Sequence, residues 1–237
     1  MPLVAAAVCP HPPMIVPEIA GAAARELDEL RAACDRAVAC LLAAEPSMVL
    51  VVGAGPTNGV FLPGVHDTFG RFGVPISVRL GDAAGEPRRL PLSLLVGAWL
   101  LNRAGAGAAA GRSVAESASA AECVAVGREI VDCAARVALL VMGDGSACRG
   151  EKSPGYDDPR AQAYDDSVAA ALADADSDAL LRLDPDLSAQ LKAAGRAPWQ
   201  VLAGASQAAG HPWRGRLSYY AAPYGVAYFV ATWEPAP

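Results

Sequence analysis

Three short apolar segments, each closed at once by turn residues, constrain the fold of this 237-residue chain most strongly. They occupy residues 3–9, 48–52 and 137–142, and Pro-His-Pro-Pro, Gly-Ala-Gly-Pro and Gly-Asp-Gly-Ser follow them in that order. Apolar runs of this length between turn signals are typical of strands that are buried on both faces. The sequence therefore predicts three core strands, and residues 75–80 have the character of a fourth.

Segments with helical spacing separate these strands. Residues 20–44 place apolar side chains on one face and charged side chains on the other. Further helices are predicted at residues 90–103, 118–135, 160–174, 179–183 and 187–194. Residues 198–205 fit a helix or a strand equally well. The tail, residues 216–221 and 225–233, predicts a hairpin that turns at Pro223-Tyr224-Gly225.

Strands that alternate with helices predict an α/β fold, in which helices flank a central, mostly parallel sheet. No internal repeat or linker divides the sequence, so we expect one domain over residues 1–237. The composition, with 53% apolar and 19% charged residues, is that of a chain with a sizeable core. Parallel strands place ligand sites at their carboxyl ends, which here carry His11, Gly55 and Asp144.

The charge and the apolar pattern exclude several partners. The formal net charge is −6, and Arg88-Arg89 is the only adjacent basic pair, so no nucleic-acid partner is expected. No apolar stretch is long enough to cross a bilayer, and no basic segment precedes the first apolar run, so we expect neither a membrane partner nor a signal peptide. Six cysteines without Cys-x-x-Cys spacing indicate reduced thiols and a cytoplasmic protein.

The chain has three histidines, and one of them occupies a favourable place for a site. His11 directly follows the first strand, and Pro12 and Pro13 restrict the backbone that presents it. His66 falls in the loop after the second strand, and His211 in a late loop. Because a lone loop histidine is most often a solvated side chain, position makes His11 the strongest candidate of the three.

Three other motifs do not support a known chemistry. Residues 53–59 have a glycine spacing one residue too long for a dinucleotide loop, and Pro56 stands where the helix should begin. Residues 143–147 lack the last glycine of the nucleophile elbow of α/β hydrolases. Asp157 and Asp158 precede Pro159, which is typical of a helix cap.

Several motifs, in order along the chain, resemble the class III extradiol dioxygenase catalytic-subunit family (LigB-like, including MEMO-like relatives). The segments that resemble the family are residues 10–19 (PHPPMIVPEI), 69–75 (FGRFGVP), 143–146 (GDGS), 155–160 (GYDDPR), 204–205 (GA) and 222–228 (APYGVAY). They span nearly the whole chain. The resemblance implies a single LigB-like domain over residues 1–237.

The resemblance also implies a metal site, of which this chain retains one position in four. In the family two histidines and a glutamate hold Fe(II), and a further histidine acts as acid and base. His11 matches the first metal ligand, whereas the other positions fall at Gly55, Ala147 and Ala193. Since one ligand does not retain iron, the resemblance implies no resident cofactor and no ring-cleaving activity.

We therefore expect a non-catalytic protein that binds a small molecule or a partner. The small residues at the lost positions predict a roomier and less polar pocket, edged by His11, Asn58, Asp144, Ser146 and Tyr156. The opposite outcome is also open, in which neighbouring side chains fill this space and leave no ligand site.

Two other functions remain as alternatives. The first is an active metalloenzyme, such as a ring-opening dioxygenase, with Fe or Zn in a rebuilt site of His11, His66 and Asp144; Cys148 and Glu151 are further candidates at the same edge. The second is a structural or interaction protein, such as a homo-oligomer, that uses the aromatic residues of the tail. The aromatic residues concerned are Trp213, Tyr219, Tyr220 and Trp233. A small partner subunit, as some family members have, could also supply missing groups.

Overall fold

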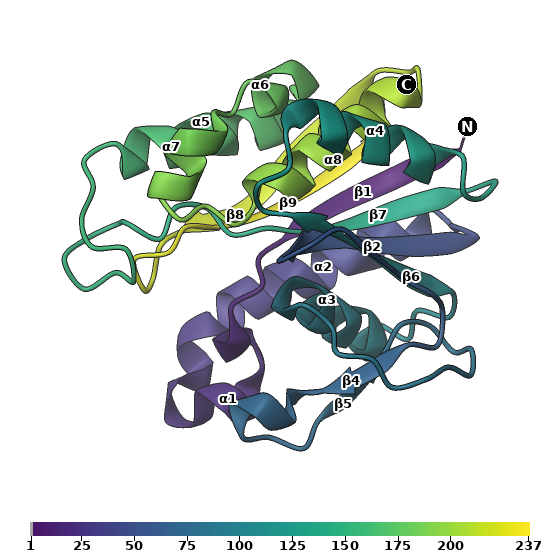
Figure 1. Ribbon diagram of the computed structural model, residues 1–237, viewed down its shortest axis with the longest axis horizontal. Coiled ribbons are helices and arrows are strands. Elements are labelled where there is room, and N and C mark those ends of the chain that lie inside the picture. The colour runs from purple at the N-terminus through teal and green to yellow at the C-terminus, as the bar shows by residue number, and fades with distance from the viewer. Residues whose placement is uncertain (1) are drawn as a thin grey trace.

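The computed structural model describes residues 2–237, which form a single α/β domain around a seven-stranded sheet (Figure 1). The strand order is β3-β6-β2-β7-β1-β9-β8, and a separate small sheet pairs β4 with β5. The strands are β1 (Leu3–Cys9), β2 (Met48–Gly55), β3 (Gly59–Phe61), β4 (His66–Thr68), β5 (Ser77–Arg79), β6 (Ala109–Ala115), β7 (Val137–Met142), β8 (Trp213–Ala221) and β9 (Tyr228–Pro235).

Helices cover both faces of the sheet. The α-helices are α1 (Pro17–Ala20), α2 (Asp28–Ala43), α3 (Leu92–Arg103), α4 (Ala120–Val131), α5 (Ala161–Asp174), α6 (Ser177–Leu181), α7 (Pro185–Gln190) and α8 (Arg196–Ala208), and 3₁₀ helices occupy Pro13–Ile15, Gly21–Leu27 and Phe69–Phe72. In Figure 1, α4 to α8 lie on one side of the sheet, and α1 to α3 lie on the other side with the small sheet.

The centre of the sheet is parallel and its margins are antiparallel. β6, β2, β7 and β1 run in the same direction, whereas β3, next to β6, and β9, next to β1, run against their neighbours. β8 and β9 form the predicted hairpin at the margin. The prediction of a mostly parallel sheet flanked by helices is therefore confirmed.

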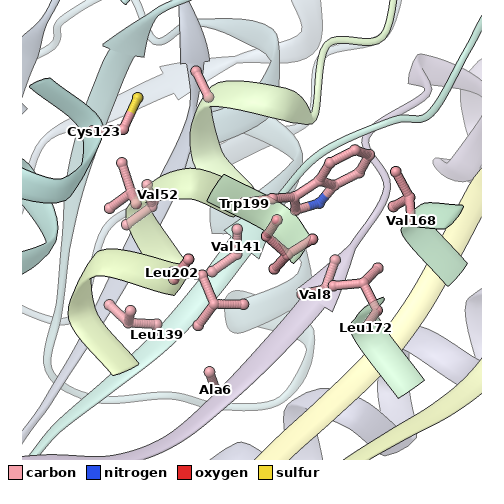
Figure 2. Packing of buried hydrophobic residues seen from close by; sticks show 14 of the residues in the cluster. Ala6, Val8, Val52, Cys123, Leu139, Val141, Val168, Leu172, Trp199 and Leu202 are labelled. Carbon is pink, nitrogen blue, oxygen red and sulfur yellow. The ribbon is translucent and has the colours of Figure 1, made fainter. Parts of the chain in front are cut away.

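The alternation of side chains along the central strands divides the core into two layers. Along β1, Val8 faces the layer formed with α4, α5 and α8, whereas Ala7 faces the layer formed with α2 and α3. Figure 2 shows the first layer, in which Val8 and Val141 meet Trp199 and Leu202 of α8. Because both faces are covered, β1 and β7 are buried at every position, which explains their uninterrupted apolar sequences.

The structure corrects the predicted elements at several places. The strand at Ala109–Ala115 was not predicted, because Gly111, Arg112 and Ser113 interrupt its apolar pattern. The single helix predicted at residues 20–44 is divided into the 3₁₀ helix Gly21–Leu27 and α2, and α1 ends just before them, where Gly21 has a φ of 55°. The ambiguous segment at residues 198–205 belongs to α8, and β2 continues to Gly55.

Two further findings concern the predicted absence of a membrane segment and the state of the cysteines. Within the described part of the chain, no helix combines the length and the apolar character that a bilayer span requires. All six cysteines are free thiols, and only Cys40 and Cys133 are exposed.

Candidate functional site

The carboxyl ends of the parallel strands meet at one edge of the sheet. β7 lies between β1 and β2, and Met142 pairs in register with both Cys9 and Gly53. His11 and Asp144 lie in the loops that follow β1 and β7, and Gly55 is the last residue of β2, so the predicted edge is formed as expected. The structure divides this edge into two halves of very different character.

His11 and Asp144 contact each other at the ends of β1 and β7. The backbone N–H of His11 donates a hydrogen bond of 2.8 Å to Oδ1 of Asp144, and its Nδ1 lies 3.6 Å from the same oxygen. His11 is 7% exposed, and its Nδ1 has no hydrogen-bond partner among residues 2–237. The pair joins two neighbouring strand ends, which gives Asp144 a structural role independent of any ligand.

A tryptophan from α8 packs against the loop that carries Asp144. Trp199 is fully buried, and a Cβ placed on Gly143 would lie 2.8 Å from its Nε1. On the other side, a Cβ on Gly195 would lie 2.1 Å from Cζ2 of the same ring. The backbone N–H of Gly195 donates to the carbonyl oxygen of Asp144 at 2.8 Å. Two glycines therefore let one large ring fill the space behind the loop.

Burial also sets the electrostatics around Asp144. Burial raises the pKa of the Asp144 carboxyl, while the His11 side chain and the hydrogen bond from the His11 backbone oppose that rise. Burial, together with the nearby Asp144 charge, raises the pKa of Tyr228 as well. A second negative charge is therefore disfavoured at this half of the edge.

Ser146 is fully buried and takes part in a polar network. Its backbone N–H and hydroxyl donate to the Asp165 carboxylate at 2.8 and 2.6 Å, and Arg149 forms an ion pair with the same carboxylate at 3.1 Å. Burial raises the pKa of Asp165, and the bonds from Ser146 and Arg149 oppose that rise. Arg149 continues the network to Tyr220, 3.2 Å away. The hydroxyl of Ser146 is thus committed to holding the loop.

The five residues predicted to edge one pocket do not gather in one place. His11 and Asp144 are in contact, but Ser146 is buried in its own network and Tyr156 is 77% exposed with a φ of 62°. Asn58 belongs to a different cavity, whose lining residues do not include the other four. The structure therefore brings His11 and Asp144 together, whereas Asn58, Ser146 and Tyr156 lie in different surroundings.

The second half of the edge is hollow. A cavity of about 580 Å³, here called the basic cavity, lies beside the ends of β2 and β6. Its polar lining residues are Thr57, Asn58, Arg71, Arg88, Arg89 and Ser113. Glycine, proline, leucine and phenylalanine make up the rest of its twelve lining residues, and none of the twelve is Asp, Glu, His or Cys.

The three arginines of the basic cavity were not predicted as site residues. The sequence showed Arg88-Arg89 only as an isolated basic pair, and Arg71 as part of a family-like segment. No periodic pattern connects these loop positions, so their meeting depends on the folded chain. The arginine pair just before a mostly apolar helical segment was the one signal that could have indicated them.

The three positions at which the resemblance implies lost site residues are Gly55, Ala147 and Ala193. Gly55 ends β2 beside Pro91 and Ser113, both of which line the basic cavity. Ala193 lines a separate cavity of about 290 Å³ with Ser188 and Arg196. Ala147 is buried, and its backbone N–H donates to the carbonyl oxygen of Leu191 at 2.9 Å.

The alternative metal site is not assembled. His66 begins β4, where its Nδ1 lies 3.3 Å from the carbonyl oxygen of Gly64. Across residues 2–237, no three His, Cys, Asp or Glu side chains are grouped so that they could hold a metal ion. His11 and Asp144 therefore lack His66 as a third ligand, and neither Cys148 nor Glu151 completes a group.

The aromatic residues of the tail are largely committed within the domain. Trp233 is buried, and its Nε1 donates to the carbonyl oxygen of Leu172 at 2.9 Å. Trp213, Tyr219 and Tyr220 on β8 are half-buried, and the Tyr220 hydroxyl donates to Asp166 at 2.6 Å. These contacts explain the aromatic pattern without an interface.

Comparisons with known proteins establish the fold alone. No family model matches this chain, and no curated protein matches it. Among solved structures, it is similar to an uncharacterized protein, JW3007, from Escherichia coli K12, with 13% sequence identity and a TM-score of 0.51. The likeness covers 98% of this chain and 99% of the other. The α/β architecture is therefore one that a natural protein of similar extent also adopts.

Proposed function

We propose that this protein is a relative of the class III extradiol dioxygenases that has lost the iron chemistry and binds a small molecule without redox chemistry. The ordered motifs from residue 10 to residue 228 support the relationship, and the parallel sheet with ligand positions at its carboxyl edge is consistent with it. The function then depends on what the altered edge can hold.

The residues at the edge do not fit an Fe(II) site. Two histidines and a carboxylate on one face are needed, and Gly55 and Ala193 stand at two of the corresponding positions. The nitrogen of His11 that the structure leaves unpartnered, Nδ1, faces Asp144 and is buried. With two potential ligands in contact and no third among residues 2–237, this edge lacks the donor set for a firmly bound metal.

The basic cavity is the observation that supports small-molecule binding. Its volume of about 580 Å³ lies within the range of roughly 300–1,000 Å³ that is usual for ligand pockets. Apolar walls with a few polar groups are also typical of such pockets. The cavity lies at the carboxyl ends of parallel strands, where ligands of α/β proteins bind.

Metal titration tests the first part of the proposal. We expect no stoichiometric binding of Fe(II) or Zn(II) by calorimetry and elemental analysis under anaerobic conditions. Stoichiometric binding that His11→Ala abolishes, and that the matched His211→Ala leaves intact, would contradict the proposal. Such a result would favour the metalloenzyme built on His11, His66 and Asp144, and a catechol panel under oxygen would follow.

Ligand screening tests the second part. We expect small aromatic compounds to raise the melting temperature of the protein, and Thr57→Trp to abolish this shift because the indole would occupy the basic cavity. Ala39→Trp, on the exposed face of α2, is the matched control and should retain the shift. Shifts that survive Thr57→Trp would show that the ligands bind elsewhere and would contradict the proposed site.

A further inference from the structure

Three cations surround the basic cavity without a carboxylate in its lining. Arg71 comes from the 3₁₀ helix Phe69–Phe72, and Arg88 and Arg89 come from the segment before α3. The whole protein carries a formal net charge of −6, so this local excess of positive charge opposes the overall balance. Several positive charges held together at one concave surface attract an anion to that surface.

Arg71 is held in place from two sides. Its Nη1 pairs with Asp67 at 3.3 Å, and its Nη2 donates to the carbonyl oxygen of Leu90 at 2.9 Å. Asp67 also accepts hydrogen bonds from the backbone N–H groups of Thr68 and Leu90, at 2.7 and 2.9 Å. The carboxylate is thus occupied by the loop, and the arginine side chain, 23% exposed, keeps a fixed position at the wall.

Arg88 and Arg89 differ in how they are bound. Arg88 donates to the carbonyl oxygen of Val60 at 2.8 Å and lies over the ring of Phe61, 4.2 Å from its centroid. The side chain of Arg89 makes no hydrogen bond or ion pair with any residue from 2 to 237. Because a guanidinium has five N–H donors, Arg88 retains free donors and Arg89 retains all of its own.

Uncharged donors face the same cavity. Asn58 uses its Oδ1 to accept from the backbone N–H of Ala115 at 2.8 Å, which leaves its amide group as a donor. Pro91 and Leu92, at the start of the twelve-residue helix α3, also line the cavity. Within the described chain, no side chain caps this helix start, so its positive end adds to the field of the arginines.

We infer that the basic cavity binds an oxyanion, a carboxylate or a phosphate group on a small carbon skeleton. The inference rests on the proposed function and names the chemistry of its ligand. Arg89 meets the oxyanion as the free partner, Arg71 and Arg88 are fixed partners at the wall, and the Asn58 amide donates a neutral hydrogen bond. Planar guanidinium groups suit carboxylate and phosphate oxygens, which accept two parallel hydrogen bonds. Phe61, Leu90 and Leu92 provide apolar contact for the rest of the molecule.

Calorimetric titration of the full chain with three matched probes tests the inference. The probes are benzoate, phenyl phosphate and the neutral benzyl alcohol, and comparison of the two anions shows which oxyanion the cavity prefers. We expect at least one anion to bind about tenfold or more tightly than benzyl alcohol, and the difference to diminish as salt is raised. Arg89→Ala should lower the affinity for that anion by about tenfold or more, because one charge-assisted hydrogen-bond partner is lost.

Arg128→Ala is the control variant, because it removes the same charge from the exposed face of α4 on the other side of the sheet. Equal weakening by Arg128→Ala and Arg89→Ala would overturn the inference, since only the net charge would then matter. Benzyl alcohol that binds as tightly as both anions, and loses affinity in Thr57→Trp, would overturn the inference but leave the proposed function intact. No binding by any of the three probes would overturn both.

Discussion

The two halves of the carboxyl edge each contain one glycine-rich turn, at residues 143–145 and 53–59, and reach opposite outcomes. At the ends of β1 and β7, polar residues are buried, paired and packed behind a tryptophan, and we call this region the sealed half. At the ends of β2 and β6, the loops stand apart and enclose the basic cavity. Both halves carry glycine-rich loops, so the number of small residues does not decide which half is open.

The two halves differ in the side chains that the neighbouring helix packs against each strand end. Behind Gly143, α8 supplies the ring of Trp199, and Gly195 lets that ring approach. Beside Gly55, the start of α3 supplies only Pro91, and β6 supplies Ser113. A small residue at a strand end therefore leaves space only where no large side chain from a neighbouring element fills it.

The largest expected effect is the loss of the ring that fills the sealed half. Trp199→Ala should lower the free energy of unfolding by about 3–5 kcal/mol, since a fully buried ring is replaced by a cavity. Urea denaturation measures this loss. Arg89→Ala, in the open half, should change the same quantity by less than about 0.5 kcal/mol. A Trp199→Ala loss as small as that of Arg89→Ala would contradict the contrast between the halves.

The fold was predictable where burial produced an unmistakable pattern. β1 and β7 are buried on both faces, so their apolar runs show their full lengths, residues 3–9 and 137–142. In β6, Arg112 interrupts the run because it reaches Glu129 of α4 at 2.7 Å, a contact that only the folded chain forms. α8 was ambiguous because residues 196–206 are all buried, which removes the helical periodicity on which a prediction depends.

A smaller loss of stability is expected when the buried carboxylate that accepts hydrogen bonds from Ser146 is replaced. Asp165→Asn should lower the free energy of unfolding by about 1.5–3 kcal/mol, because both carboxyl oxygens accept hydrogen bonds and the amide replaces one of these acceptors by a donor. Burial raises the pKa of Asp165 above the unfolded value of about 3.9, despite the opposing bonds from Ser146 and Arg149. The stabilisation linked to its protonation is therefore full below about pH 4 and is lost as the pH rises through the folded pKa.

The cost of Asp165→Asn should thus be larger at pH 4 than at pH 7, which urea unfolding at several pH values measures. Its neighbour Asp166 is a matched control, because the pKa of Asp166 is shifted in the opposite direction. Hydrogen bonds from Tyr220 and Gln162 lower the pKa of Asp166, so its contribution is lost as the pH falls. If Asp165→Asn and Asp166→Asn follow the same trend with pH, burial does not dominate at Asp165.

Substituting one glycine in each half compares the packing of the two halves directly. A Cβ on Gly143 would lie 2.6 Å from the Cα of Gly195, whereas a Cβ on Gly55 would come no closer than 3.1 Å to Ser113. Gly143→Ala should therefore cost about 1–3 kcal/mol through overpacking, and Gly55→Ala less than about 1 kcal/mol. Thermal and urea denaturation of the two variants measure the difference. Equal losses of unfolding free energy in the two variants would mean that the two halves of the edge are packed to the same density.

The site was predictable only as far as topology places residues. The parallel order of β1, β7 and β2 brings His11, Asp144 and Gly55 to one edge, as the sequence predicted. The insertion of Trp199 depends on the approach of α8, which no local pattern records. The arginines of the basic cavity belong to irregular loops without periodicity, so the sequence indicated neither their meeting nor the absence of acids among them.

The smallest expected effect concerns the wall of the open half. Arg88→Ala removes a guanidinium that lies over Phe61 and donates to the carbonyl oxygen of Val60. Since the Arg88 side chain is itself exposed, the free energy of unfolding should fall by only about 0.5–1 kcal/mol. Arg88→Lys keeps the charge but not the planar group, so it should recover little of this loss. Full recovery in Arg88→Lys would show that charge alone holds the wall, and the contrast would then rest on electrostatics instead of packing.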